Sequence, residues 1–416
     1  MILEGKNMIA RYEQVGLYSK KEYKRRADLV RSEMKKKSVD VVLMLACTNE
    51  SHDHWLTGRE FLDYVIVPAE GEIIGVLLDE IDESAYEGNL NRLDFDRYVY
   101  QREFTTDADG IRFVNRVSDA VLAELIRDLG GKRIGLVNPR HLTCSMDDAL
   151  RKTISDLQYV DMTKEIDIRK TVKSKEELEC IRMSAEAQGQ MMDALEHMLR
   201  PGRRYQEVRM EVRDQIVSLG GSGVMLCVLL YLGDQNEVCP KFDMNKDDFV
   251  LKEGDTFFSL MEGASYGGHC VAMGRNFIVG KATEEYKESV ELNGKLNLYA
   301  ASMMKPGTTL RQIVTEVKNY VMKNSGAYHR CCWMHGLSTA NFMEQYSVQD
   351  ISFDWPLEEG AVLHCHPYTK RHMPWLGAGA YEDMRLLNTY VVTPEGGKSL
   401  VDLEKHPFSL VETGVD

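Results

Sequence analysis

The sequence predicts a mixed α/β protein built from two domains. Its 416 residues exceed what a single hydrophobic core ordinarily serves. Helix and strand signals alternate through the first third of the chain, and the second half contains one helix–Pro-Gly–helix pattern twice. We expect the first domain to span residues 1–165 and the second to span residues 166–416.

The first domain is expected to contain a sheet of mixed strand direction. Ser19 and Glu22 have the spacing of a capping box, and apolar residues follow at helical spacing from Tyr23 to Met34. A second helical pattern covers 114–129, and strand-like apolar runs cover 41–45, 73–78 and 133–137. Residues 163–173 are charged and have no apolar face, which predicts a domain boundary there.

A long amphipathic helix is predicted to open the second domain. Ser174 and Glu177 again have capping-box spacing, and apolar residues recur at steps of three and four from Leu178 to Leu199. A Pro-Gly pair at 201–202 ends this helix, and a second pair at 306–307 ends a later one. Because a further helix and strand-like sequence follow each pair, we predict a duplicated α/β half.

Composition excludes several classes of function. A net charge of −14 repels phosphate groups, so neither nucleic acid nor an anionic membrane is an expected partner. The most apolar run, 224–232, is far shorter than the roughly 20 residues of a membrane helix. The opening residues lack the apolar core of a signal peptide. Nine cysteines without regular spacing are typical of free thiols, and we expect a cytoplasmic protein.

Six segments carry motifs of one known family and follow its order. They are 23–58, 169–178, 253–277, Trp333-Met334-His335-Gly336, 359–362 and 389–396. In these segments the chain resembles the creatinase, Xaa-Pro aminopeptidase and prolidase family. The resemblance implies a creatinase-type N-terminal domain, a pseudo-two-fold "pita-bread" catalytic domain and hydrolase activity. It also implies a homodimer in which the N-terminal domain of one subunit contributes to the active site of the other.

The resemblance also identifies where the chain departs from its metal-dependent relatives. Those relatives hold two divalent ions with two Asp, one His and two Glu, because hard cations require anionic oxygen ligands. The corresponding positions in this sequence are Met261, Ala272, His335, His366 and Leu387. Carboxylates are thus exchanged for imidazoles and apolar groups. This exchange predicts an enzyme without a metal cofactor.

Three histidines are expected to meet in the pocket as catalytic groups. His364 and His366 lie two residues apart on a predicted strand and therefore share a face. His335 lies in the family's histidine motif, which faces the same pocket. Imidazole titrates near neutral pH, so such a cluster serves as general acid and base. The three rings are also the ligand set of one zinc or iron ion, and that alternative stays open here.

Five further residues are candidates for substrate binding. Arg385 stands two residues before the last ligand position and has the fork that clamps a carboxylate. His269 and Glu262 belong to the first hairpin, and a one-residue shift of the alignment brings Glu262 to the first ligand position. Cys239 lies in a loop similar to the one that carries the family's proton-shuttling histidine. Arg59 follows a motif of the N-terminal domain that reaches the partner's site in creatinase-like dimers.

These residues favour a creatinase-like, metal-independent hydrolase that cleaves a C–N bond of a small charged nitrogenous metabolite. His335 would be its general acid or base. One alternative is a mononuclear metallohydrolase or lyase, Xaa-Pro peptidase activity included. Another is a catalytically inactive pita-bread protein that binds a partner. The retained histidines favour the two enzyme hypotheses, whereas the bulky Met261 and Leu387 favour the first hypothesis or the third.

Overall fold

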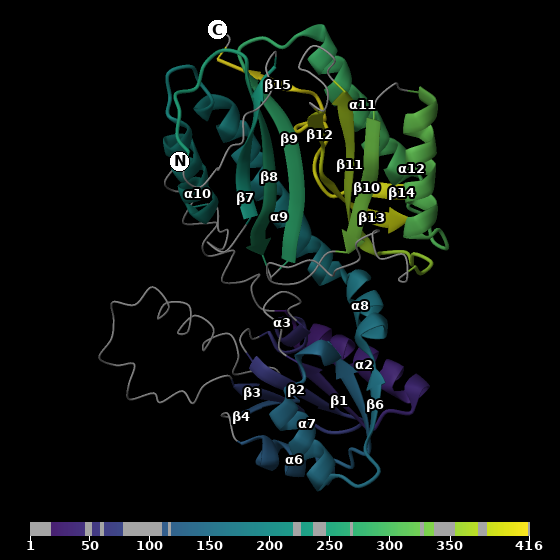
Figure 1. Ribbon diagram of the computed structural model, residues 1–416. Helices are drawn as coiled ribbons and strands as arrows, with labels where there is room; N and C mark the ends of the chain where they lie inside the picture. The colour runs from purple at the N-terminus through teal and green to yellow at the C-terminus, as the bar shows by residue number, and fades with distance from the viewer. Residues whose placement is uncertain are drawn as a thin grey trace, which may run out of the picture. The chain divides into compact units, whose positions relative to one another are not determined.

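Two compact units make up the chain (Figure 1). The computed structural model describes residues 18–45, 52–58, 62–77, 110–114, 118–218, 226–235, 247–266, 269–324, 328–336, 354–372 and 381–414. Contacts divide these residues between Lys170 and Thr171. The division at residue 165 stays a prediction of where the domains begin and end. Among the described helices, none is both long enough and apolar enough to cross a membrane.

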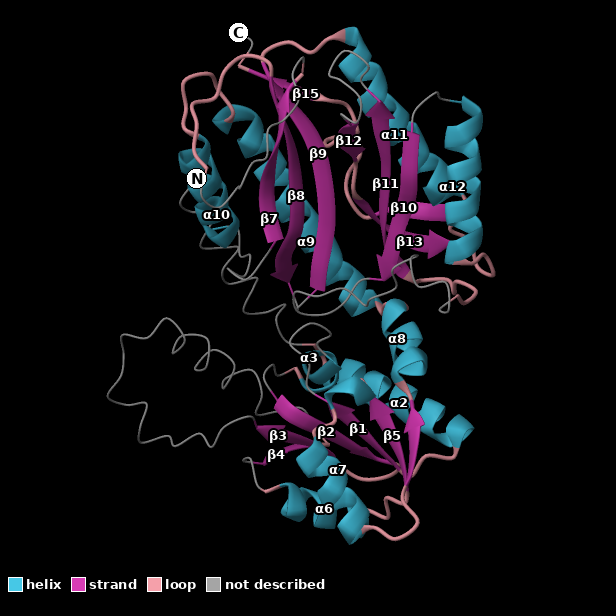
Figure 2. Ribbon diagram, viewed as in Figure 1, coloured by secondary structure: helices cyan, strands magenta, loops and turns pink. Residues whose placement is uncertain are grey.

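The N-terminal unit is built on one six-stranded sheet (Figure 2). Its strands are β1 (Val41–Leu45), β2 (Leu62–Pro68), β3 (Ile73–Leu77), β4 (Ile111–Val114), β5 (Arg133–Val137) and β6 (Gln158–Asp161). Their order is β4-β3-β2-β1-β5-β6. The β1–β2 and β2–β3 pairs are antiparallel and the other three are parallel. The sheet of mixed direction predicted for this domain is confirmed.

Helices cover both faces of this sheet. They are α2 (Lys20–Lys37), α3 (His52–Thr57), α6 (Asp119–Asp128), α7 (Cys144–Thr153) and α8 (Thr163–Thr171). Successive side chains of a strand point to opposite faces. Val42 and Met44 therefore pack with α2, α3 and α8, whereas Leu43 packs with α6 and α7.

Local signals predicted two of these helices, α2 and α6, and two predictions need correction. Ser19 Oγ accepts the backbone N–H of Glu22 at 3.2 Å and so begins α2 as predicted. The helix predicted over 114–129 begins later, because Val114 ends β4 and Ser118 caps α6. Residues 163–171 form the helix α8, since Ile166 is fully buried although its neighbours are charged.

The C-terminal unit contains two largely antiparallel sheets, which are joined through β9 and the chain around the start of β13. The first has the order β15-β9-β8-β7 and the second the order β10-β11-β13-β14, with β12 paired to β11. The strands are β7 (Leu226–Asp234), β8 (Asp255–Tyr266), β9 (His269–Val279), β10 (Tyr328–Gly336), β11 (Val362–His372), β12 (Tyr381–Arg385), β13 (Asn388–Thr393), β14 (Gly396–Ser399) and β15 (Val411–Thr413). Among the described strands of this unit, only β15 runs parallel to its neighbour. Gly274 and Leu387 exchange backbone hydrogen bonds of 3.1 and 3.3 Å, which join the two sheets.

The duplication predicted from the Pro-Gly pairs is present in this unit. Its helices are α9 (Lys175–Met198), α10 (Tyr205–Ser218), α11 (Glu284–Ser302) and α12 (Leu310–Asn324). Gly202 and Gly307 take φ angles of 86° and 88°, a region that favours glycine. Each donates its N–H to a leucine carbonyl, Leu251 at 2.8 Å and Leu357 at 2.9 Å. The same turn therefore connects both helix pairs, and the pseudo-two-fold catalytic domain is confirmed.

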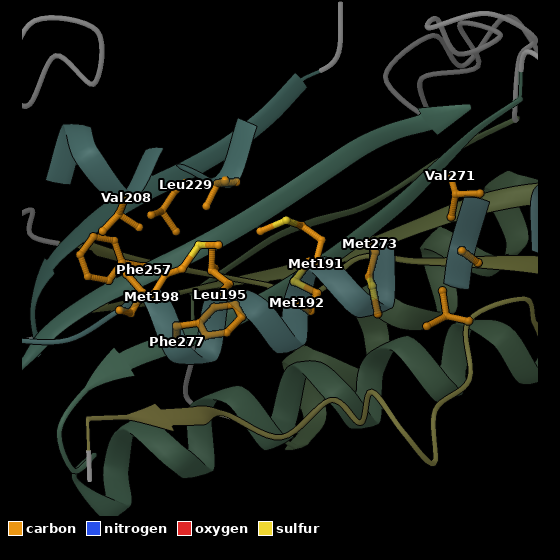
Figure 3. Close-up of a cluster of buried hydrophobic side chains, with 14 of the residues drawn as sticks. Met191, Met192, Leu195, Met198, Val208, Leu229, Phe257, Val271, Met273 and Phe277 are labelled. Carbon is orange, nitrogen blue, oxygen red and sulfur yellow. The ribbon is translucent and has the colours of Figure 1, made fainter. Parts of the chain in front are cut away.

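The core of this unit lies between α9 and the strands β8 and β9 (Figure 3). The predicted capping box at Ser174 and Glu177 is present at the start of α9. Met191 and Leu195 of α9 pack in one buried cluster with Val271 and Met273 of β9. Burial of each such side chain stabilises the fold by roughly 1.5–3 kcal/mol. Because side chains alternate along β9, Ala272 and Gly274 lie on the other face of the strand.

Candidate active site

The predicted site lies where the two sheets of the C-terminal unit meet. The strand register sets His335 of β10 opposite His364 of β11, and His364 opposite Thr389 of β13. The hydroxyl oxygen of Thr389 then contacts β9, 3.2 Å from the backbone nitrogen of Ala272 and 3.0 Å from its carbonyl oxygen. One row of residues therefore runs from β10 across β11 and β13 to β9.

His364 is buried within the site and is held by a hydrogen bond. Its ring is fully buried, and its Nδ1 lies 2.8 Å from Oγ1 of Thr389. His366 follows on the same face of β11, as predicted from their spacing. The two rings meet edge to face, with centroids 6.1 Å apart and an interplanar angle of 73°. His366 retains 9% exposure whereas His364 has none, so His366 is the one nearer to solvent.

Asn297 of α11 is hydrogen-bonded to β11 between these histidines and to the segment that joins β12 to β13. Its amide nitrogen donates to the carbonyls of Cys365 at 3.3 Å and Leu386 at 3.2 Å. Its side-chain oxygen accepts the hydroxyl of Tyr390 at 2.6 Å. Neither Asn297 nor Thr389 was among the predicted site residues. A polar residue on the apolar face of a predicted helix was the available signal for Asn297, because such a residue is buried only with partners.

His269 lies on the opposite face of β9, against α9. Both His269 and Glu177 are fully buried, and the Nε2 of the histidine lies 3.7 Å from Oε1 of the glutamate. Ser184 of α9 donates its hydroxyl to the backbone carbonyl of His269 at 3.3 Å. The presence of a histidine at position 269 is therefore explained by its contacts with α9. His269 does not lie in the row that contains His364.

The other candidates are fixed only by their backbone register. Glu262 stands opposite Ala272 in the β8–β9 pair. Arg385 stands opposite Tyr368, which lies two residues from His366 along β11. The side chains of Glu262, Arg385 and His335 are outside the described part of the structure, as are residues 59 and 239 altogether. The roles predicted for Arg59 and Cys239 therefore stay predictions.

A second buried histidine contact lies in the N-terminal unit. His52 begins α3, and its Nε2 is 2.7 Å from Oδ1 of Asp167 on α8. The amide nitrogen of Asn138 lies 3.5 Å from the other ring nitrogen. Burial raises the pKa of Asp167 to about 7, with Lys170 lowering it and Asp161 raising it further. This pair connects two helices of one unit, which explains why the sequence places a histidine there.

The comparison with known families decides what kind of site this is. The sequence profile of metallopeptidase family M24 matches residues 179–394, just over half of the chain. The chain belongs to metallopeptidase family M24. The matched range runs from the first turns of α9 to the end of β13, and so includes every described residue of the row above. The predicted resemblance to the creatinase and Xaa-Pro aminopeptidase family is confirmed.

The individual proteins similar to this chain are distant from it in sequence. An uncharacterized peptidase of Staphylococcus epidermidis is 24% identical over 277 residues, which is 65% of this chain and 74% of the relative. Dipeptidase PepE of Mycobacterium ulcerans has 16% identity and a TM-score of 0.71, with 95% of this chain and 100% of that one covered. The X-Pro aminopeptidase of Thermotoga maritima has 16% identity and a TM-score of 0.70, with 92% and 98% covered. At these identities the solved structures establish the fold.

Membership in M24 overturns one prediction. We expected a protein without a metal cofactor, because carboxylates are missing from the ligand positions. M24 is a family of metallopeptidases, so metal independence is not what membership implies, and that prediction is wrong. An enzyme of this family has to be assayed with divalent ions present.

The described side chains at two of the ligand positions nevertheless do not fit a pair of ions. Ala272 and Leu387 are buried and pack with Phe258 in an apolar cluster. A Cβ atom added to Gly274 would lie 2.6 Å from the Phe258 ring and 3.0 Å from Leu387, so the cluster is tightly filled. Among the described residues, no three His, Cys, Asp or Glu side chains are grouped to hold a metal. The chemistry of the site is therefore derived from its histidines.

Proposed function

We propose that this M24 protein hydrolyses a C–N bond of a small substrate, with the peptide bond of a short peptide as the first substrate class. The observation that carries the proposal is the buried His364, 2.8 Å from Thr389, in a row with His335 and beside His366. Membership in a peptidase family supports a hydrolytic reaction. The dipeptidase and aminopeptidase named among the similar structures support a short peptide.

The reaction requires one group that first accepts a proton and later returns it. The oxygen of water bonds to the substrate carbonyl carbon while an imidazole nitrogen takes a proton from that water. The C–N bond then breaks, and the imidazolium gives the proton to the leaving nitrogen. In our proposal His335 is this general base and acid, and His366 and His364 assist it. Neutral imidazole suits both steps, because its pKa lies near physiological pH.

Substrate orientation is assigned to the charged residues at the rim of the row. Arg385 would pair with a substrate carboxylate, for which a guanidinium offers two parallel N–H donors. Its register position opposite Tyr368 supports this, since that position lies beside His366 on β11. Glu262, opposite Ala272 in the register, would bind an amino group of the substrate. Together, the two assignments predict a small substrate that carries both a carboxylate and an amino group.

A second candidate reaction is cleavage of a non-peptide C–N bond, as in creatinase. The apolar side chains of Ala272 and Leu387 favour it, because they remove carboxylates from positions where the family's peptidases hold metal. A small charged nitrogenous metabolite would then be the substrate. The same histidines would transfer the proton.

One assay separates these possibilities. Purified protein is incubated with a panel of dipeptides, Xaa-Pro dipeptides and small guanidino compounds, with and without added Mn²⁺, Co²⁺ or Zn²⁺, and the products are identified by mass spectrometry. We expect the wild-type protein to hydrolyse a dipeptide. The rate of this hydrolysis should fall by about 100-fold or more in His364→Gln. His197→Gln, on the exposed end of α9, is the matched control and retains full activity. Lack of turnover for every compound under every metal condition would favour a binding protein and refute the proposal.

The assembly is part of the same proposal. We infer a cytoplasmic homodimer in which the N-terminal domain of one subunit, with Arg59, contributes to the site of the other. Light scattering after gel filtration measures its mass. A monomer of about 47.5 kDa at assay concentration would contradict the dimer.

A further inference from the structure

Thr389 stands at the centre of three polar contacts in the row of site residues. Its Oγ1 lies 3.2 Å from the backbone nitrogen of Ala272, 3.0 Å from the carbonyl oxygen of Ala272 and 2.8 Å from Nδ1 of His364. All three residues are fully buried. Water is therefore excluded from this junction, and the three groups have to satisfy one another.

The number of available hydrogens decides which group is the donor in each hydrogen bond. A threonine hydroxyl has one hydrogen to donate and two lone pairs to accept with. The N–H of Ala272 only donates, so it occupies one lone pair, and the carbonyl of Ala272 only accepts, so it takes the hydroxyl hydrogen. The remaining lone pair faces His364. In the arrangement that satisfies all three contacts, Nδ1 of His364 is the donor.

We propose that Thr389 is a positioning residue that holds neutral His364 as its Nδ1–H tautomer. The lone pair of the imidazole then lies at Nε2, on the side of the ring away from Thr389. His364 therefore enters the site as an acceptor of protons. The hydrogen bond made by one ring nitrogen commonly sets the state of the other in this way.

This tautomer sets the direction in which a proton can pass along the row of histidines. Register places His335 on the far side of His364 from Thr389, because β11 lies between β10 and β13. A lone pair turned away from Thr389 makes His364 an acceptor for a neighbouring imidazole that holds the proton taken from water. The role of this proton transfer in turnover rests on the proposed function. The assignment of the tautomer does not depend on that function.

The tautomer can be read directly without any substrate. Protein labelled with ¹³C and ¹⁵N in its 11 histidines is measured at a pH well above about 6.5, where an ordinary imidazole is neutral. His364→Gln identifies the signal of His364 by its disappearance. We expect the ring shifts of the Nδ1–H form in the wild-type protein. The shifts of the Nε2–H form would overturn the proposal.

Variants of the hydroxyl provide the second measurement. Thr389→Val keeps the shape of the side chain and should change the tautomer ratio of His364 about tenfold toward Nε2–H, as expected for one lost hydrogen bond. Thr389→Ser should restore the wild-type ratio. Thr393→Val is the matched control, because Thr393 lies on the same strand and bonds to Glu395 and Gly396 instead. An unchanged ratio in Thr389→Val would also overturn the proposal.

The outcome is independent of whether the protein is an enzyme. If the wild type shows the Nδ1–H form but hydrolyses nothing, Thr389 keeps its positioning role and the hydrolase proposal fails. If the protein is active and Thr389→Val lowers kcat with KM and tautomer unchanged, the hydrolase proposal stands and the tautomer proposal fails.

Discussion

The two units of this protein each bury a histidine, and they hold it in opposite ways. In the N-terminal unit His52 faces a carboxyl group, with Nε2 2.7 Å from Asp167 and an amide donor, Asn138, on the side of Nδ1. In the C-terminal unit His364 faces a hydroxyl, with Nδ1 2.8 Å from Thr389. The contacts therefore favour the Nε2–H tautomer for His52 and the Nδ1–H tautomer for His364.

The difference separates a structural histidine from one suited to chemistry. His52 lies between a donor and an acceptor that belong to its own unit, so its hydrogen-bonding capacity serves the packing of α3 on α8. His364 is anchored through one nitrogen by a neutral group, which leaves the basic nitrogen for the row that contains His335 and His366. A titrating carboxyl makes the first contact depend on pH, and a hydroxyl does not.

The largest expected effect on stability comes from Asp167. Its pKa of about 7 in the folded protein lies above the value of 3.8 for an unperturbed aspartate, so the folded state binds the proton more tightly. The resulting stabilisation is complete below about pH 4 and is lost as the pH rises to about 7. At about 1.4 kcal/mol per pH unit in this window, the loss is on the order of 4 kcal/mol.

Asp167→Asn should remove that dependence, because an amide has no proton to lose in this range. Hydrogen exchange of α3 and α8, followed at pH 4.5 and pH 7.5, measures the local stability in both proteins. We expect wild type to lose protection relative to Asp167→Asn as the pH rises. Equal changes in the two proteins would show that the carboxyl does not make the N-terminal contact sensitive to pH.

The next effect concerns how the C-terminal histidines are held. Asn297→Ala removes two bonds to backbone carbonyls and leaves the buried hydroxyl of Tyr390 without the acceptor it has now. We expect a loss of about 2–3 kcal/mol in the free energy of unfolding of the C-terminal unit. Denaturant unfolding measures it, with Ser302→Ala on the exposed surface of the same helix as control. A loss no larger than that of the control would mean that α11 does not anchor β11.

The smallest effects test whether the two units can be perturbed separately. Ser19→Ala removes the cap of α2, and Ser174→Ala removes the capping box of α9. Each change should cost about 1 kcal/mol, because one helical N–H loses its partner. Protection from hydrogen exchange should weaken in the unit that carries the change and remain unchanged in the other. Weakened protection in both units from either change would contradict their independence.

Sequence patterns predicted the fold well because they record local chemistry. The caps at Ser19 and Ser174 and the two Pro-Gly turns were visible as short motifs, and family resemblance supplied the order of the segments. The helix α8 was missed because its burial depends on contacts with residues distant in sequence. The contact between Asp167 and His52 is one of them. Local periodicity carries no information about such partners.

The site was predictable in its residue types but not in its connections. Strand alternation placed His364 and His366 together, and the structure has their rings 6.1 Å apart. The hydroxyl of Thr389 meets His364 only because β11 and β13 pair in one register, which no local pattern specifies. The expectation of a metal-free protein was wrong for another reason. It gave the residues at the ligand positions more weight than membership in a metallopeptidase family.

The central claim is that hydrolysis depends on the histidine held by Thr389 and not on the one held by Asp167. Its most direct test is kcat of His364→Gln and His52→Gln, measured on the same C–N substrate under the same metal conditions and divided by the folded fraction of each protein. We predict a loss of about 100-fold or more for His364→Gln and less than about twofold for His52→Gln. Equal kcat values for His364→Gln and wild type would contradict the account.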